Sequence, residues 1–282
     1  MHIYLFVPMI GLAGFAAAPA HAQSEDNMPA VVVSGSAALA SDYRFRGVSQ
    51  TDENMAIQGG VTITHESGFY AGAWASNLSN WGTFGGANME LDLIGGYKAK
   101  LSDNLTVDAG LTWYMYPGGA DKSDFAEPYV KLTGTAGPAT LTAGAAYAPK
   151  QQALGRWYDS GADAAAGVYD RPADKADNLY VWGDAAMAIA GSPITAKAHV
   201  GHSSGHDGLG PNGTALTPTG DYWDWSIGAD ATWRNLTLNV SYVDTDISTA
   251  KAATLQPGFS KGQDGIGSIA DAAVVVSLTA AF

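Results

Sequence analysis

The chain has 282 residues and carries 27 Asp and Glu against 14 Lys and Arg, a formal net charge of −13. A chain this acidic repels a phosphate backbone, which excludes nucleic acid as a partner. It contains no cysteine, so disulfide scaffolds, thiolate metal sites and cysteine nucleophiles are excluded as well. Beyond the N-terminus, no apolar run approaches the roughly 20 residues that a membrane-spanning helix needs.

The first residues predict an export signal. Residues 3–18 form an apolar stretch, which is followed by Ala20-His21-Ala22, a small-x-small site of the kind that signal peptidase cleaves. We therefore expect a cleaved signal peptide at 1–22. An uncleaved membrane anchor is the alternative, but the stretch is short for a bilayer, and its start carries His2 in place of Lys or Arg. Export of a chain without cysteine indicates the cell outer membrane of a Gram-negative bacterium.

The rest of the chain alternates between apolar and polar residues with a period of two. Met89, Leu91 and Leu93 are apolar, for example, whereas Glu90 and Asp92 between them are charged. This period predicts β-strands with one apolar and one polar face. Most of these segments have about the 9–11 residues that a tilted strand needs to cross a bilayer. The predicted strands are 35–46, 55–65, 68–77, 88–100, 104–116, 125–134, 139–149, 178–188, 193–202, 221–233, 235–244 and 270–282.

The predicted connections alternate in length along the chain. This sorting is typical of outer-membrane barrels, which have short periplasmic turns, long outer loops and an even number of strands. We therefore predict an all-β fold, a transmembrane antiparallel up-and-down β-barrel of about 12 strands at 34–282, preceded by a short N-terminal segment at 23–33. The short turns are 66–67, 101–103, 135–138, 189–192 and the step at Arg234, and the long loops are 47–54, 78–87, 117–124, 150–177, 203–220 and 245–269.

The C-terminus and the aromatic residues agree with this fold. Val274, Val276 and Leu278 share one face of the last predicted strand, and the chain ends on Phe282. A terminal Phe at this spacing resembles the signal by which the barrel-assembly machinery recognises its substrates, so Phe282 is the candidate assembly signal. Tyr and Trp rings prefer the headgroup depth, which predicts one aromatic girdle at each interface. The loop-side girdle would contain Tyr43, Phe45, Trp113, Tyr116, Tyr147, Tyr180, Trp182, Tyr222, Trp223 and Tyr242, and the turn-side girdle Phe69, Tyr97, Trp233 and Phe282.

Several motifs in the first 120 residues resemble the TorF-type porin family of bacterial outer-membrane proteins. They are Ser41–Thr51, Ile57–Gly60, Gly68–Asn77, Glu90–Asp92, Gly95–Tyr97 and Tyr114–Gly118, whereas the second half of the chain matches mainly in its barrel pattern and terminal Phe. The resemblance implies an outer-membrane barrel that acts as a diffusion channel. It supports location and fold more than it identifies a solute.

The candidate functional residues are the polar ones that alternation places inside the barrel. The pore-lining candidates are Asp42, Arg44, Arg46, Glu90, Asp92, Lys98, Asp108 and Tyr114, and the same parity places Gln58, Thr62, Glu127, Lys131, Asp184, Lys197, Asp224 and Asp230 inside. Opposed arginines and carboxylates in a pore select solutes by charge. We expect Arg44 and Arg46 to face Glu90 and Asp92 at a constriction, because arginine on the lipid face costs about 2–4 kcal/mol at the midplane.

The predicted function is a porin-like channel for passive diffusion of small hydrophilic solutes, with a mild preference against anions. The expected partners are outer-membrane lipid, the barrel-assembly machinery with periplasmic chaperones, and those solutes; no cofactor is expected, and the oligomeric state is open. The alternative is a closed structural or adhesive barrel whose long loops bind partners, because the lumen charges could pair and fill a twelve-stranded interior. A barrel lipid hydrolase is a further alternative.

Two patterns that resemble catalytic or metal sites are weak. Gly201–Gly205 matches G-x-S-x-G, but the residues after it cannot start the helix that such a serine needs. His199, His202 and His206 are better explained by a polar surface loop than by a metal site, since their spacing is not that of a rigid site. A barrel hydrolase would need a serine beside His65 or His199, and neither has an evident serine partner in the sequence. We expect neither catalysis nor a bound metal.

Overall fold

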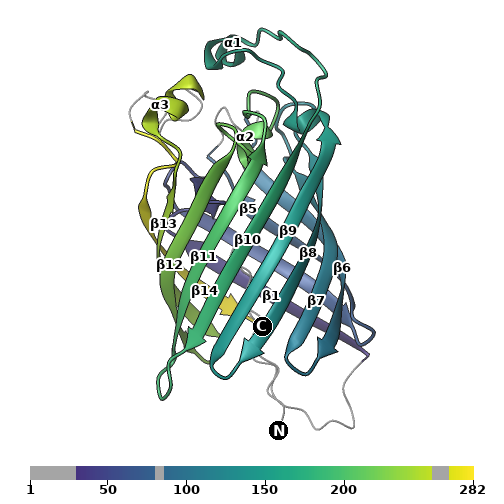
Figure 1. The fold of residues 1–282 in the computed structure, drawn as a ribbon, viewed down its shortest axis with the longest axis vertical. Coiled ribbons are helices and arrows are strands. Elements are labelled where there is room, and N and C mark those ends of the chain that lie inside the picture. Colours follow the sequence, from purple (N-terminus) through teal and green to yellow (C-terminus); the bar gives the residue numbers. More distant parts are fainter. Residues whose placement is uncertain (1–29, 80–85, 256–266) are drawn as a thin grey trace.

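The protein is a closed β-barrel. The computed structural model describes residues 30–79, 86–255 and 267–282, so the predicted signal peptide at 1–22 lies outside the described residues. Within this part of the chain, each strand pairs antiparallel with its neighbour, and the first strand pairs with the last. The barrel strands are β1 (Val31–Ala40), β4 (Ala56–His65), β5 (Phe69–Asn77), β6 (Met89–Ser102), β7 (Leu105–Met115), β8 (Phe125–Ala136), β9 (Ala139–Gln151), β10 (Ala176–Ala188), β11 (Ile194–Gly205), β12 (Tyr222–Trp233), β13 (Leu236–Thr245) and β14 (Ala273–Ala281) (Figure 1).

Short turns gather at one end of the barrel, the turn side, and long connections at the other, the loop side (Figure 1). This arrangement confirms the predicted alternation of connection lengths. Small helices lie in the long connections: η3 (Gln152–Leu154), α1 (Gly161–Ala166), α2 (Gly213–Leu216), α3 (Thr249–Ala252) and η4 (Ala253–Leu255). Among the described residues, no helix is long and apolar enough to cross a membrane.

Every barrel strand carries apolar side chains on its outer face. On β14, for instance, Val274, Val276 and Leu278 are exposed, whereas Val275 and Ser277 between them are partly buried. Exposed large apolar side chains recur in this way around the barrel, from Leu39 and Ile57 to Val240 and Leu278. A protein surrounded by water rarely exposes an apolar surface of this extent, so the barrel wall is suited to contact with lipid hydrocarbon.

The predicted strands agree with the observed ones except at the first. Eleven predicted segments overlap an observed strand with ends that differ by only a few residues, but the segment 35–46 is wrong, because β1 begins at Val31 and ends at Ala40. The following residues 41–55 leave the wall and form a two-stranded hairpin of β2 (Arg44–Phe45) and β3 (Val48–Ser49). We call residues 41–55 the inner hairpin. Its tip combines positive φ angles at Arg46 (48°) and Gly47 (81°), the combination that a tight two-residue hairpin turn requires.

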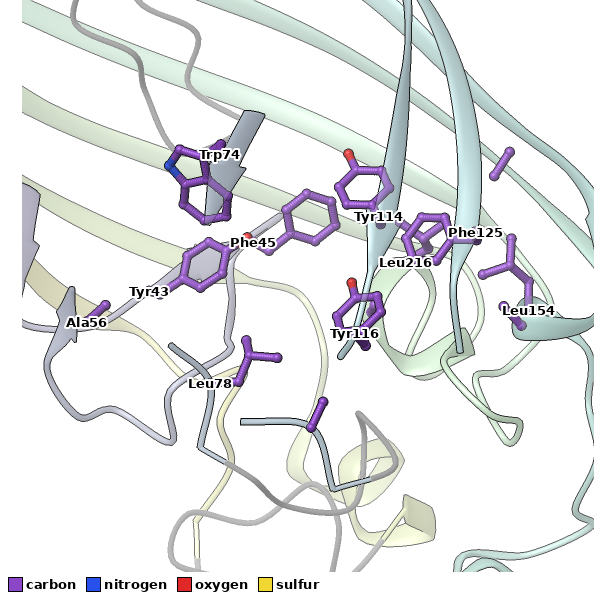
Figure 2. Packing of buried hydrophobic residues seen from close by; sticks show 14 of the residues in the cluster. Tyr43, Phe45, Ala56, Trp74, Leu78, Tyr114, Tyr116, Phe125, Leu154 and Leu216 are labelled. Carbon is purple, nitrogen blue, oxygen red and sulfur yellow. The ribbon is translucent and has the colours of Figure 1, made fainter. Parts of the chain in front are cut away.

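The inner hairpin forms the centre of the largest buried cluster. Tyr43 and Phe45 of the hairpin pack against Trp74 of β5 and Tyr114 of β7, with ring centroids 5.4 Å apart for Tyr43 and Trp74 and 5.8 Å apart for Phe45 and Tyr114 (Figure 2). Phe125 of β8 stacks on Tyr114 at 4.5 Å. The core of this barrel is therefore inside its loop-side half, where residues of the hairpin meet residues of the wall.

Several rings that the sequence predicts for the loop-side girdle lie inside the barrel instead. Tyr43, Phe45, Tyr116, Tyr180 and Tyr222 are all buried, so their placement at the lipid interface is wrong. The same holds for Trp182, which packs against Tyr180 and donates to the lumen residue Asp184. The remaining girdle prediction is confirmed in part: Trp113, Tyr147, Trp223 and Tyr242 on the loop side and Phe69, Tyr97, Trp233 and Phe282 on the turn side are exposed on the outer surface. For Tyr43 and Phe45, alternation misses the difference because the inner hairpin keeps the apolar-polar pattern of a wall strand. Tyr180 and Tyr222, in contrast, share the parity of the lumen residues Asp184 and Asp224.

Candidate lumen site

The predicted lumen residues of β6 and β7 lie on the inner face of the wall. Asp92 pairs in register with Tyr114, and Lys98 with Asp108, so each pair extends into the lumen side by side. Glu90, Asp92, Asp108 and Tyr114 are buried, and the side chain of Lys98 is 39% exposed. Strand alternation thus brings these five residues onto one lumen surface.

The three candidates that precede them do not belong to the wall. Asp42, Arg44 and Arg46 were expected on a strand at 35–46, but the structure places all three in the inner hairpin. The expected pairing of Arg44 and Arg46 with Glu90 and Asp92 is also wrong: each arginine has its own carboxylate partners elsewhere. The physical reason is the turn at Arg46 and Gly47, which directs the hairpin tip across the lumen rather than along β1.

Arg46 anchors the hairpin tip to the wall opposite β1. Its Nη2 donates to both carboxylate oxygens of Glu127 on β8 at 2.7 Å, and its Nη1 donates to Asn178 Oδ1 on β10 at 3.1 Å. The guanidinium carbon lies 4.0 Å from the ring centroid of Tyr180, a cation–π distance. Tyr222 of β12 donates to the Arg46 carbonyl at 3.0 Å. These buried contacts with three different strands hold the inner hairpin across the lumen.

Arg44 and Asp42 hold the base of the inner hairpin. Arg44 Nε donates to Asp42 Oδ2 at 2.5 Å, and Nη1 donates to the carbonyls of Ile269 and Asp271, which precede β14. Asp42 also accepts bonds from the hydroxyls of Ser49 and Thr51. Burial, together with the nearby Glu53, raises the pKa of the Asp271 carboxyl. Arg44 therefore ties the base to the connection before the last strand.

The two carboxylates of β6 face the aromatic part of the inner hairpin. Glu90 accepts a hydrogen bond from Tyr43 Oη at 3.2 Å. Asp92 is fully buried, and among the described residues neither of its carboxylate oxygens has a hydrogen-bond partner. The same holds for the hydroxyl of Thr112 on β7, one lumen position away from Tyr114. Glu90 and Asp92 are thus buried on the same face of β6 beside the hairpin, and neither forms an ion pair with an arginine.

A second group of charges lies nearer the turn side around Asp108. Lys131 Nζ lies 3.2 Å and Lys98 Nζ 3.7 Å from Asp108 Oδ2, while Tyr70 donates to Asp108 Oδ1 at 2.7 Å. Tyr70 also shares a hydrogen bond with Tyr129. This network spans β5 to β8 and keeps ionised side chains of both signs on the inner wall.

His199 forms a third polar group, which the sequence analysis placed incorrectly in a surface loop. His199 is on β11 inside the barrel, where Nδ1 lies 2.7 Å from Asp184 Oδ1 and Nε2 lies 3.1 Å from Asp224 Oδ1. Tyr180 bonds to both His199 and Asp224. The signal was present in the sequence, because Lys197 was assigned to the lumen and His199 shares its parity. Lys197 itself pairs with Asp230 at 3.1 Å.

On β12 and β13, lumen side chains become more accessible from the loop side to the turn side. On β12, Tyr222 and Asp224 are buried, whereas Asp230 is only partly buried. On β13, Thr245 is buried, whereas Asn239 is partly buried. The gradient follows from the inner hairpin, which fills the loop-side half and does not reach the turn-side half. On these two strands, the loop-side half of the lumen is therefore packed more tightly than the turn-side half.

Small residues on the lumen face make room for aromatic rings of the next strand. A Cβ on Gly144 would lie 2.3 Å from the ring of Trp182, whereas a Cβ on Gly183 would have Thr142 O as its nearest neighbour, at 3.8 Å. We expect Gly144→Ala to lower the free energy of unfolding by about 1–3 kcal/mol through overpacking, and Gly183→Ala to leave it nearly unchanged. Urea titration of the refolded barrel, read by heat-modifiable gel mobility, measures both; equal stability of the two variants would contradict the packing.

The serine and histidine motifs lack catalytic geometry in the described residues. Ser203 is buried within β11 and donates its hydroxyl to the carbonyl of Leu216. Contrary to the sequence analysis, His65 has a serine partner: its Nδ1 lies 2.7 Å from Ser67 Oγ, but it also accepts the Ser67 backbone N–H, as in a turn cap. Within the described ranges, no group of three or more His, Asp or Glu side chains is arranged to hold a metal ion.

A family model covers nearly the whole chain. Residues 24–282 match the model described as a bacterial protein of unknown function, Gcw_chp. The chain belongs to the Gcw_chp family. A search of curated proteins gives no match for this Gcw_chp member.

Solved structures of porins share the fold of the Gcw_chp barrel. The NanC porin is similar with a TM-score of 0.52 and 13% sequence identity, over 89% of this chain and 99% of that chain. The KdgM porin, solved in complex with disordered oligogalacturonate, is similar with a TM-score of 0.50 and 7% identity, over 89% of this chain and 98% of that chain. At these identities the similarity shows a common fold.

Proposed function

We propose that this protein is a porin-like channel through which small hydrophilic solutes diffuse passively across the outer membrane. The observation that carries the proposal is the combination of an apolar outer wall with a lumen lined by ionised side chains of both signs. Burying such charges is costly unless they are paired or hydrated, and the partial exposure of the Lys98 side chain supports a hydrated lumen. The inner hairpin is the constriction of this channel.

The route to the membrane is part of the same proposal. A signal peptide at 1–22 would direct export, and the barrel at 34–282, preceded by the segment 23–33, would then be inserted by the barrel-assembly machinery with Phe282 as its recognition signal. The apolar wall and the aromatic residues at both rims support insertion into a bilayer. Membership in the TorF-type porin family and a homo-oligomeric state belong to this proposal, because the motifs at Ser41–Thr51 and Tyr114–Gly118 carry the resemblance.

The charges of the lumen favour cations and neutral solutes. Acidic side chains outnumber the basic side chains inside the barrel: Glu90, Asp92, Asp108, Glu127, Asp184, Asp224 and Asp230 against Arg46, Lys98, Lys131, Lys197 and the imidazole of His199. Rings of acidic side chains favour cations in channels. The oligogalacturonate in complex with which the KdgM porin was solved is a polyanion. We therefore propose a solute class other than acidic oligosaccharides.

A closed barrel is the second candidate, and the packing of the inner hairpin favours it. Tyr43, Phe45 and Arg46 are buried among wall residues on the loop side. In a closed barrel, the hairpin seals the lumen, and the protein acts through long loops that bind partners.

Planar-bilayer recording of the refolded mature chain separates the two candidates. A channel is expected to give discrete openings whose conductance rises with salt concentration, with a reversal potential of cation-selective sign in a salt gradient. Heat-modifiable gel mobility serves as the control for folding. Silence from a preparation that is demonstrably folded would overturn the channel and favour the closed barrel, and anion selectivity would overturn the proposed solute class.

A further inference from the structure

A groove lined by three lysines lies at the loop-side rim. Its volume is about 370 Å³, and it is lined by Lys122, Asp124, Lys150, Gln151, Gln152, Ala153 and Lys175. These residues come from the connection before β8, the end of β9 with the start of η3, and the residue before β10. Three neighbouring strand ends therefore contribute to one groove at the loop-side rim.

The lysines of this groove differ from the other basic residues of the chain. Lys122, Lys150 and Lys175 are exposed, and in the described part of the chain none of them has an acidic group within ion-pair distance. The lumen lysines Lys131 and Lys197, in contrast, are paired with Asp108 and Asp230. Asp124 also lines the groove, and Lys150 interacts electrostatically with Asp177, so the three lysines give the groove a lining with more basic than acidic side chains in a chain of net charge −13.

The walls of the groove are fixed by hydrogen bonds. Gln151 donates to the carbonyl of Ala126 and accepts from its N–H, and Asp124 accepts from the N–H of Tyr116. The Ala153 carbonyl accepts from Asn212 N at 2.8 Å. Only the lysine side chains are free to adjust, so the groove is organised before a ligand binds, which reduces the entropic cost of binding.

We propose that this groove binds a phosphate group carried by a molecule at the outer face of the membrane. Lysine ammonium groups are point charges that suit phosphate, whose oxygens accept several hydrogen bonds at once. The groove volume is within the range of about 300–1,000 Å³ that is usual for small-ligand sites. The acidic lumen opposes passage of the same anion, so the groove retains its ligand at the rim and does not feed the channel.

Two sources present this chemistry: a lipid headgroup phosphate in the outer leaflet and a soluble phosphate compound. The test compares the refolded mature chain with Lys122→Gln/Lys150→Gln/Lys175→Gln. The matched control is Lys100→Gln/Arg234→Gln/Lys251→Gln, which removes the same charge from three exposed positions outside the groove. The protein is held in detergent micelles with lipopolysaccharide added, with inorganic phosphate added, or with neither, and lysine acylation is followed by mass spectrometry.

Protection of Lys122, Lys150 and Lys175 in the lipopolysaccharide arm alone supports a lipid headgroup, and protection by inorganic phosphate supports a soluble source. In either case the thermal stability of the wild-type and control proteins is expected to rise with the ligand, and that of the groove variant is not. The proposal would be overturned if the groove lysines were acylated to the same extent as Lys100 and Lys251 in every arm. The readouts do not involve conductance, so a failure here is separate from a failure of the channel.

Discussion

Arg46→Gln is expected to raise the open-channel current of the reconstituted barrel, because it removes the charge that holds the inner hairpin across the lumen. Glu127 would then remain buried without the two 2.7 Å bonds that it accepts from Arg46. Breaking a buried ion pair by removing one partner costs about 3–5 kcal/mol. Since each 1.4 kcal/mol changes an equilibrium constant about tenfold, the hairpin should leave the lumen a hundredfold more often or better. Single-channel recording measures the result as larger or more frequent openings.

The control for this effect is Arg171→Gln, which removes an arginine paired with Asp159 in an exposed part of the connection between β9 and β10. Exposed pairs contribute little, so its current is expected to match that of the wild type. Arg46→Gln with unchanged conductance and unchanged opening frequency would show that the inner hairpin does not limit the current.

Gly47→Ala is expected to displace the inner hairpin from the lumen, as Arg46→Gln does, without changing any charge. Gly47 has a φ of 81°, and a Cβ there would lie 2.4 Å from Thr245 Cγ2 and 3.0 Å from Asp224 Cβ. The methyl group would push the hairpin tip away from β12 and β13. If Gly47→Ala and Arg46→Gln raise the single-channel current to a similar extent, the increase is caused by the position of the hairpin and not by the lost charge.

The barrel could be predicted from the sequence because its signals are local. A strand with one face toward lipid and one toward a polar lumen must alternate, and the connection lengths repeat the same two-sided order. Glu90, Asp92, Lys98, Asp108 and Tyr114 were assigned to the lumen by this parity alone. No knowledge of their partners was needed, since parity depends only on the strand to which each residue belongs.

The inner hairpin could not be predicted in this way, because its position depends on contacts distant in sequence. Arg46 is 81 residues from Glu127 and 132 from Asn178. Meanwhile Tyr43 and Phe45 preserve the alternation of β1, although they contact other buried side chains instead of lipid. A turn signal was present in Arg46-Gly47, but arginine is an unusual residue at a positive φ, and the pattern before and after it favours a continuous strand.

Deleting Phe282, or replacing it with serine, is expected to cause a large loss of assembled barrel in the outer membrane. Phe282 closes the seam where β14 meets β1: Gly35 N donates to Phe282 O at 2.7 Å, and Phe282 N donates to Gly35 O at 2.9 Å. Its ring lies over Gly35, where a Cβ would be 2.7 Å from the ring. The deletion therefore removes two backbone bonds of the closing pair together with the candidate assembly signal. Heat-modifiable protein in the outer-membrane fraction measures the loss.

Phe69→Ser is the matched control for Phe282→Ser, because Phe69 is also an exposed ring on the turn side but lies at the start of β5, away from the seam. The serine variant keeps the backbone bonds of residue 282, whereas the deletion removes them. Comparing the two variants therefore separates the role of the ring from that of the backbone bonds. If Phe282→Ser refolds normally in detergent but fails to accumulate in cells, the ring acts in recognition by the assembly machinery. If it fails in both, the ring is needed for closure over Gly35. Normal accumulation of both Phe282 variants would contradict both roles, since neither a recognition signal nor a closing residue can be lost without effect.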